Sequence, residues 1–216
     1  MDDLDKSQLD KTQKTIIAYD KLSGMYAYKY MNYDVYIKKI KEFTEYLNEE
    51  DNILDLCCGP GNVGKQLVLC GKDITITGID LSEKMLEIAK QNVPDATFYC
   101  QDIRNIDFSE ESFDAIMLSF CIVHLTDREA AQLIERAAGY LRRGGKLYLS
   151  FIEGTEKGFE TTVFSKEAIF FNYYLTEEIK HLLKTNGIEA FQISKQEYPE
   201  SNGIIKTEVF IFAEKI

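Results

Sequence analysis

The sequence predicts an α/β fold, in which a mostly parallel sheet of seven strands carries helices on both faces and is finished by a C-terminal antiparallel β-hairpin. Two observations lead to this prediction. Short β-branched or apolar runs alternate with helical stretches between residues 53 and 152, which is typical of parallel strands joined by crossover helices. Two more extended runs then follow each other around 199–203 with no helix between them, as in a hairpin.

Residues 1–50 are predicted to be helical. The segment 34–48 should pack on the core, because one helical face of it is apolar and carries Val35, Ile40, Phe43 and Leu47. The stretch from Tyr19 to Tyr33 is rich in tyrosine and has no clean period, so we expect a helix that breaks near Ser23–Gly24. These tyrosines form either a lid over a ligand or a packing surface whose hydroxyls face water.

The alternating part of the chain opens with a strand over 53–56 that ends beside a glycine-rich turn. Further strands are predicted over 74–80, 96–100, 113–119 and 146–152, and helices over 62–69, 83–91 and 128–140. Gly144–Gly145 is expected to turn the chain into the last of these strands. Thr176 should cap a helix over 177–185, after which 188–197 and 205–213 form the hairpin.

Residues 153–175 form an insert that is too aromatic for a solvated linker and too long for an ordinary turn. Its aromatic residues are Phe159, Phe164, Phe170, Phe171, Tyr173 and Tyr174. Because long loops of this kind are usually functional, we expect this insert and the tyrosine-rich segment to shape a substrate site.

Length and charge limit the possible functions. A chain of 216 residues with 45% hydrophobic content can bury one sizeable core, so a single domain over 1–216 is expected, with 1–50 as a helical lid. The 25 basic and 36 acidic residues give a formal net charge of −11, which repels phosphate backbones and anionic lipids. Nucleic acids and membranes are therefore not the expected partners, and a small-molecule substrate remains.

The sequence also predicts a cytoplasmic location and no metal site. No apolar run approaches the roughly 20 residues that span a bilayer, and a basic secretory start is lacking. The cysteines are odd in number, lack C-x-x-C spacing and are expected to be reduced; they are Cys57, Cys58, Cys70, Cys100 and Cys121. Both histidines, His124 and His181, lie far from any cysteine pair with zinc-like spacing.

Three acids stand at the ends of the first three predicted strands, where an open α/β sheet binds its ligand. The two oxygens of Asp80 suit both hydroxyls of a ribose. Asp102 and the amide of Ile103 suit the edge of a nucleotide base, with Leu81 and Ile103 on either side of the ring. Asp55 is expected to fix the loop amides or to receive a ligand ammonium through water.

One interpretation of these features is a dinucleotide site. Residues 59–64 match G-x-G-x-x-G, and Asp80 lies near the expected offset of roughly 20 residues. In a dinucleotide site, however, the first glycine closely follows the strand, whereas here residues 55–58 intervene and place an acid, Asp55, at the end of the strand. Asp102 and the terminal hairpin also have no role in a dinucleotide site.

Taken together, five motifs resemble those of class I S-adenosylmethionine-dependent methyltransferases over about 19–216. They are Leu54–Gly61, Gly78–Ser82 with Met85, Gln101–Ile103, Phe113–Met117 with Ser119 and His124–Leu125, and Leu141–Lys146. The resemblance implies a Rossmann-like fold and S-adenosylmethionine as the cofactor.

The resemblance also implies roles for individual residues. Asp80 would bind the ribose, Asp102 and Ile103 the adenine, and the 57–61 loop the methionine portion. Tyr19 and Tyr26 align with the lid segment of similar enzymes and would face the sulfonium, a contact that Tyr174 also offers. The expected cofactor-binding residues are Tyr19, Tyr26, Asp55, Cys57, Cys58, Gly59, Gly61, Asp80, Leu81, Met85, Asp102, Ile103 and Ser119.

One residue departs from the family pattern, because members usually carry glycine where this chain has Cys57. A small cysteine is expected to be tolerated there, with the ligand contacted through backbone atoms. The alternative is a redox switch at Cys57–Cys58, although adjacent cysteines pair only with strain.

The implied reaction is methyl transfer to an unidentified small-molecule acceptor by in-line displacement, which mainly needs alignment and exclusion of water. His124 is the candidate catalytic base, and the alternative is an imidazole bonded to backbone at a helix start. Two other functions stay open: a non-catalytic S-adenosylmethionine-binding sensor or regulatory subunit, and an NAD-dependent oxidoreductase. The sequence does not predict the oligomeric state.

Overall fold

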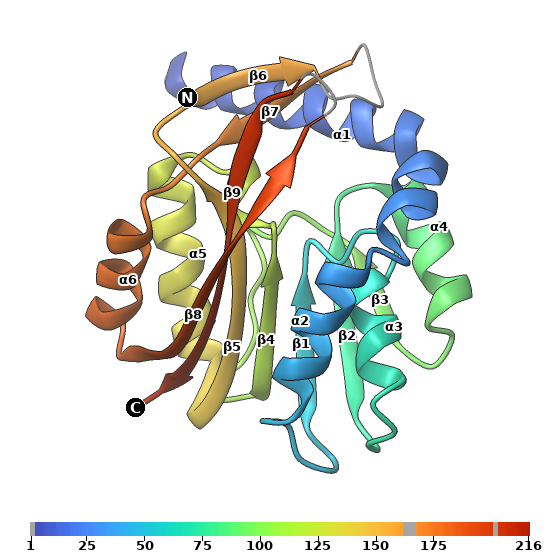
Figure 1. Ribbon diagram of the computed structural model, residues 1–216, viewed down its shortest axis with the longest axis vertical. Coiled ribbons are helices and arrows are strands. Elements are labelled where there is room, and N and C mark those ends of the chain that lie inside the picture. Colours follow the sequence, from blue (N-terminus) through green and yellow to red (C-terminus); the bar gives the residue numbers. More distant parts are fainter. Residues whose placement is uncertain (1–2, 162–166, 201–202) are drawn as a thin grey trace.

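The computed structural model describes residues 3–161, 167–200 and 203–216 (Figure 1). The helices are α1 (Asp3–Tyr30), α2 (Asp34–Thr44), α3 (Asn62–Val68), α4 (Glu83–Asn92), the 3-10 helix η1 (Ile122–His124), α5 (Asp127–Tyr140) and α6 (Thr176–Thr185). The strands are β1 (Asn52–Leu56), β2 (Thr75–Asp80), β3 (Thr97–Cys100), β4 (Phe113–Ser119), β5 (Leu141–Glu153), β6 (Lys157–Thr161), β7 (Ala168–Asn172), β8 (Ile188–Pro199) and β9 (Ile205–Lys215).

The main sheet has seven strands in the order β3-β2-β1-β4-β5-β9-β8. Strands β1 to β5 pair in parallel, and β9 pairs antiparallel with both β5 and β8. The predicted α/β class with a C-terminal antiparallel hairpin is therefore confirmed. The strand order reverses between β1 and β4, which is the place where open α/β sheets bind their ligands.

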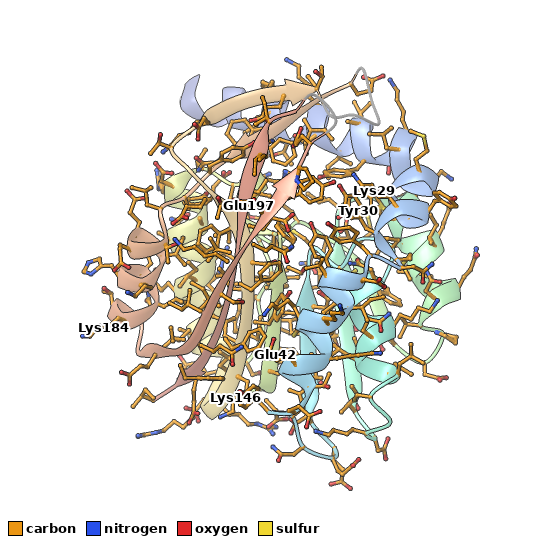
Figure 2. The ribbon with its side chains drawn as sticks, viewed as in Figure 1. Lys29, Tyr30, Glu42, Lys146, Lys184 and Glu197 are labelled. Atoms are coloured by element: carbon orange, nitrogen blue, oxygen red, sulfur yellow. The ribbon has the colours of Figure 1, made fainter. Side chains whose placement is uncertain are left out.

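Helices cover both faces of the sheet, as predicted. Successive residues of a strand point to opposite faces, so the apolar residues of one buried strand pack against helices on both sides. Ile53 and Met117 pack with residues of α2 and α3, whereas Leu54 and Leu118 pack with residues of α5 and α6. Burying each such side chain contributes roughly 1.5–3 kcal/mol. Figure 2 shows side chains filling the space between the layers, while Lys184 on α6 points away from the sheet.

Helix α1 runs without interruption through Gly24, so the predicted break near Ser23–Gly24 is wrong. A glycine inside a helix costs only about 0.5–1 kcal/mol, and tertiary contacts offset that cost. Leu22 packs against Ile169 of β7, and the hydroxyl of Ser82 at the start of α4 donates to Asp20 over 2.5 Å. In Figure 1, α1 lies across the carboxyl ends of the parallel strands.

The 153–175 insert is not an unstructured connection, because β6 and β7 pair in it as an antiparallel hairpin. Phe159 and Phe170 are register partners and pack with ring centroids 5.8 Å apart. Phe164 lies outside the described residues. Tyr174 does not face a ligand as proposed from the sequence: it is buried, and its hydroxyl donates to the carbonyl of Leu125 over 2.8 Å.

Two predicted boundaries also differ. Gly144–Gly145 lies within β5 at an irregularity of the β4–β5 register, where a Cβ on Gly145 would be 2.8 Å from the carbonyl oxygen of Arg142. Helix α6 is preceded by Leu175, and the hydroxyl of Thr176 donates to Glu153 over 2.6 Å instead of capping the helix.

None of the described helices is long and apolar enough to cross a membrane. Over the same described ranges, no group of three or more His, Cys, Asp or Glu side chains is arranged to hold a metal ion.

Candidate active site

Two neighbouring cavities lie at the carboxyl ends of the parallel strands, beneath α1. The first, the strand-end cavity, holds about 790 Å³ of space including its mouth and is bounded by the ends of β1 to β4. The second, the tyrosine cavity, holds about 1010 Å³ and is bounded by α1, β6, β7, β8 and β9. Four residues line both cavities: Tyr19, Tyr26, Phe120 and His124.

Most residues proposed from the sequence line the strand-end cavity. They are Tyr19, Tyr26, Cys57, Gly59, Asp80, Leu81, Met85, Asp102, Ile103, Ser119 and His124. Asp55, Cys58 and Gly61 are not part of its lining. The other lining residues were not among the expected site residues, although Gln101 and Leu125 belong to the motifs named from the sequence; they are Thr12, Thr15, Ile16, Gln101, Arg104, Phe120, Cys121 and Leu125. A signal for the first three was present, since positions 12, 15, 16, 19 and 26 fall on one helical face.

The loop after β1 turns through left-handed backbone. Cys57 has φ +59°, Gly59 +53° and Gly61 +79°. The glycine that the resemblance implies at the first of these positions would suit this conformation, because left-handed backbone costs other residues about 1–2 kcal/mol. A Cβ on Gly61 would lie 3.2 Å from the Cα of Ala89, so this glycine lets α3 and α4 approach each other.

The carboxylate of Asp80 is held by the backbone on both sides. One oxygen accepts from the amide of Gly59 over 2.8 Å, and the other accepts from the amide of Ser82 over 2.9 Å. Burial raises the pKa of Asp80, and these amides oppose the shift. A carboxylate has about four lone-pair sites, so each oxygen can still accept a ligand hydroxyl.

Asp55 plays a different part from the one expected. From the sequence, Asp55 was expected to fix the loop amides or to receive a ligand ammonium through water. In the structure the Gly59 amide donates to Asp80 and the Cys58 amide donates to the Ile79 carbonyl, so Asp55 does not fix these amides. Asp55 is 2% exposed, and its Oδ1 has no hydrogen-bond partner among the residues that the structure describes. Burial and the charge of Asp80 raise its pKa well above the ordinary value.

The sulfur atom that faces Cys57 belongs to Cys121 and not to Cys58. The Sγ atoms of Cys57 and Cys121 lie 3.0 Å apart, and both residues line the strand-end cavity. All five cysteines are free. The bond from Cys121 and burial raise the pKa of the Cys57 thiol, which disfavours the reactive thiolate. A redox pair at Cys57–Cys58 therefore has no geometric support.

An ionic network runs along one wall of the strand-end cavity. The guanidinium of Arg104 contacts both oxygens of Asp102 over 2.6–3.0 Å and also donates to Glu129 over 2.8 Å. Lys11 of α1 donates to the other oxygen of Glu129 over 2.9 Å and to the carbonyl of His124 over 3.2 Å. The network joins α1, α5 and the loop after β3, and it fixes the carboxylate of Asp102.

His124 sits at the junction of the two cavities, with both ring nitrogens engaged. Nδ1 lies 2.9 Å from the carbonyl oxygen of Phe170, so this nitrogen carries the hydrogen. Nε2 then accepts from the hydroxyl of Tyr19, also over 2.9 Å. Burial lowers the pKa of His124 to about 4, so the imidazole is neutral at pH 7.

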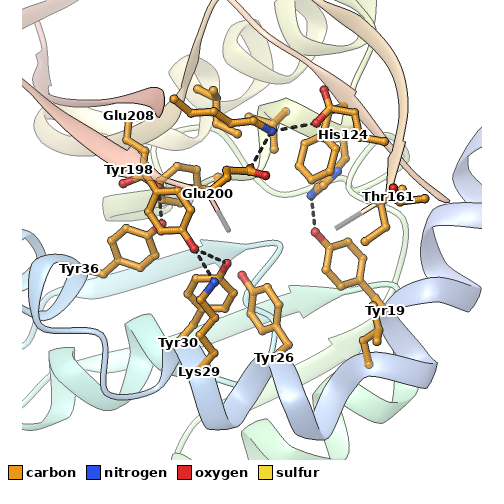
Figure 3. A pocket seen from close by; sticks show the side chains of 18 residues that line it. Tyr19, Tyr26, Lys29, Tyr30, Tyr36, His124, Thr161, Tyr198, Glu200 and Glu208 are labelled. Atoms are coloured by element: carbon orange, nitrogen blue, oxygen red, sulfur yellow. Dashed lines mark hydrogen bonds and ion pairs between the residues drawn. The ribbon is translucent and has the colours of Figure 1, made fainter. Parts of the chain in front are cut away.

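The tyrosine cavity combines aromatic rings with charged groups (Figure 3). Its aromatic wall comes from α1, α2, the β4–η1 loop, β7 and β8, and consists of Tyr19, Tyr26, Tyr30, Tyr36, Phe120, Phe171 and Tyr198. Its charged residues are Lys29, Glu160, Glu200, Lys206 and Glu208. Neither α2 nor the β8–β9 hairpin was predicted to contribute to a site.

A parallel sheet with acids at the ends of β2 and β3, next to a cavity at the strand-order reversal, defines an α/β protein of the nucleotide-binding class. Residues 53–145 match a family model described as a methyltransferase domain. Over 149 residues the chain is 31% identical to an uncharacterized methyltransferase of Anoxybacillus flavithermus, which covers 62% of this chain and 68% of that protein. Over 129 residues it is 33% identical to the demethylmenaquinone methyltransferase of Thermotoga maritima, which covers 59% of this chain and 55% of that protein.

Among solved structures, a SAM-dependent methyltransferase from Methanosarcina mazei superposes with a TM-score of 0.71 at 20% identity, covering 81% of this chain and 97% of that one. The chain belongs to the class I S-adenosylmethionine-dependent methyltransferases. The chain spans about half the length of several curated relatives that it matches. For example, its match covers 55% of the length of the Thermotoga maritima protein.

Proposed function

We propose that this chain transfers a methyl group from S-adenosylmethionine in the strand-end cavity to a small molecule in the tyrosine cavity, by in-line displacement. The observation that carries the proposal is the junction at Tyr19, Tyr26, Phe120 and His124, where ligands in the two cavities would meet. S-adenosylmethionine supplies an electrophilic methyl group on a sulfonium. Orienting the reactants lowers the barrier by roughly 7–11 kcal/mol in favourable cases.

The residues of the strand-end cavity fit this cofactor. The free lone pairs of Asp80 suit a ribose diol, and the apolar side chains of Leu81 and Ile103 suit a purine ring. Asp102 has a fixed orientation and suits the amino group of adenine. The left-handed loop at Cys57–Gly59 suits contact through the backbone. The negative charge of Asp80 and the rings of Tyr19 and Tyr26 favour the sulfonium cation.

We also propose that α1 acts as a lid. It supplies Thr12, Thr15, Ile16 and both shared tyrosines to the cavity walls, so ligand exchange requires this helix to move. The hairpin of the 153–175 insert supplies Glu160, Thr161, Ile169 and Phe171 to the tyrosine cavity, in line with its expected role in acceptor specificity. Closure of α1 over both cavities would exclude water from the reaction.

We assign His124 to the positioning of Tyr19 and not to proton removal. A base whose conjugate acid has a pKa of about 4 accepts a proton weakly, and its Nε2 is occupied by the Tyr19 hydroxyl. The neutral imidazole holds the Tyr19 hydroxyl in place and so fixes the orientation of the Tyr19 ring at the junction.

The net charge of −11 supports a small-molecule acceptor over a nucleic acid, and the free cysteines support a cytoplasmic location. Two curated relatives are named for demethylmenaquinone and for ubiquinone biosynthesis, but their matches extend over only 59% and 55% of this chain. Their names make a quinol a candidate acceptor to be tested.

The test is transfer of isotope from methyl-labelled S-adenosylmethionine into a pool of small molecules extracted from cells. We expect label in this pool with the wild-type chain and at least about tenfold less with Asp80→Ala, because a charge-assisted contact is lost. If the cofactor binds but no label leaves it in any extract, the chain is a sensor or regulatory subunit instead.

A further inference from the structure

The charged groups of the tyrosine cavity are unevenly paired. Lys206 forms ion pairs with Glu160 over 2.8 Å and with Glu200 over 2.9 Å, so one ammonium serves two carboxylates and this cluster keeps a negative charge. Glu208 is outside this cluster. Its oxygens accept from neutral donors, the hydroxyl of Tyr36 and the amide of Gln196, each over 2.5 Å.

Glu208 is also deeply buried. It is 4% exposed, although it lines the cavity. Burial raises its pKa, while the bonds from Tyr36 and Gln196 and the charge of Lys29 oppose the shift. A buried carboxylate with neutral donors is stabilised further by a cation that enters the cavity beside it.

The aromatic wall already accommodates ammonium groups. The Nζ atom of Lys29 lies 4.9 Å from the ring centroid of Tyr30 and donates a hydrogen bond to the hydroxyl of Tyr198, as the dashed line in Figure 3 shows. Lys206 lies 5.0 Å from the centroid of Tyr173 and 5.5 Å from that of Phe171. The distances to Tyr30 and Phe171 are within the roughly 6 Å range of cation–π attraction, whereas Tyr198 and Tyr173 contact the ammonium groups through their hydroxyls.

The surroundings also favour one kind of nucleophile. Burial makes an ammonium easier to deprotonate, because the charged form loses its hydration, while a carboxylate beside the ammonium opposes this shift. The same burial, together with nearby carboxylates, makes a phenol or alcohol harder to deprotonate. His124 offers no strong base that would reverse this preference.

We propose that the methyl acceptor is an organic amine, bound as its ammonium beside Glu208 and among the rings of the tyrosine cavity. This inference rests on the proposed methyl transfer. The ammonium gives one proton to the Glu208 carboxylate, and the nitrogen lone pair forms a bond to the methyl carbon. The carbon–sulfur bond breaks with both electrons passing to sulfur. The products are S-adenosylhomocysteine and the N-methylated ammonium, and the proton passes from Glu208 to water.

The experiment is calorimetric titration of the full chain, saturated with S-adenosylhomocysteine, against probes matched in size but not in charge. They are 2-phenylethylamine, neutral 2-phenylethanol and anionic 3-phenylpropanoate, with butylamine as a smaller amine. We expect at least one amine to bind about tenfold or more tightly than the alcohol and the acid. Only an ammonium gains both a charge-assisted hydrogen bond to Glu208 and cation–π attraction to the aromatic rings.

Matched variants test the role of Glu208. Glu208→Gln keeps the size of the side chain and should remove the preference for amines, with S-adenosylhomocysteine affinity unchanged. Glu197→Gln, an exposed position on β8, should leave all affinities unchanged (Figure 2). If the alcohol or acid binds as tightly as the amines, if no amine binds at millimolar concentration, or if Glu208→Gln keeps the preference, the inference is overturned. Failure of S-adenosylhomocysteine to bind would overturn the proposed function as well.

Discussion

Replacing Glu129 by glutamine removes the central charge of the network that joins α1 to α5 beside the strand-end cavity. Although burial alone would raise it, the Thr126 amide, Arg104 and Lys11 lower the pKa of Glu129 to about 2 from the ordinary 4.5. At about 1.36 kcal/mol per pH unit, this difference corresponds to at most about 3.4 kcal/mol. We take roughly half of it, about 2 kcal/mol, because the network borders a cavity that water can enter.

Glu129→Gln should therefore lower the free energy of unfolding at pH 7 by about 2 kcal/mol, or Tm by about 4–8 °C. Since the folded-state pKa is below the unfolded one, this stabilisation is complete above pH 4.5 and is lost as the pH falls toward 2. Urea unfolding at several pH values from 7 to 3 measures it, and the gap between wild type and variant should narrow below pH 4.5.

The matched control for this experiment is Glu135→Gln, an exposed position on the same helix, which should change the free energy of unfolding by less than about 0.5 kcal/mol. A similarly small effect of Glu129→Gln at pH 7 would refute the reasoning. A loss that stays constant down to pH 3 would show that the effect comes from packing and not from charge.

Three other outcomes are expected. Cys57→Gly should raise the free energy of unfolding by up to about 1 kcal/mol in urea titrations, because φ is +59° there; a less stable variant would mean that packing of the thiol outweighs the strain. Gly61→Ala should lower it by about 1–3 kcal/mol, since φ is +79° and the new Cβ would crowd Ala89, and unchanged stability would contradict this. His124→Ala should leave the shape of the pH–rate profile between about pH 6 and 8 unchanged, because the imidazole is already neutral. An inflection near pH 6.5 that the variant abolishes would restore His124 as a base.

Local patterns were enough to predict the sheet. The strand Phe113–Ser119 was predicted with its observed bounds, because a buried parallel strand is a continuous apolar run between turn signals. The break predicted at Gly24 was wrong because packing on β7 and α4 overrides a weak local preference. The β6–β7 hairpin was missed because its aromatic residues show no clean alternation.

The candidate site was predictable to the extent that it follows strand ends. Asp80 and Asp102 each follow a strand closely, so topology alone brings them to one cavity. The bond between Tyr19 and His124 joins residues 105 positions apart, and that between Tyr36 and Glu208 joins residues 172 apart. No short-range pattern encodes such pairs, which depend on how α1, α2 and the terminal hairpin dock on the sheet.

The presence of an adenosyl cofactor in the strand-end cavity is tested most simply by thermal unfolding with S-adenosylhomocysteine, S-adenosylmethionine and NAD. A ligand at 100 times its dissociation constant stabilises a fold by roughly 2.7 kcal/mol, or about 5–10 °C for a chain of this size. We predict this shift for both adenosyl ligands, none for NAD, and its loss in Asp80→Ala. A shift with NAD alone, or an undiminished shift in Asp80→Ala, would contradict the assignment of this cavity.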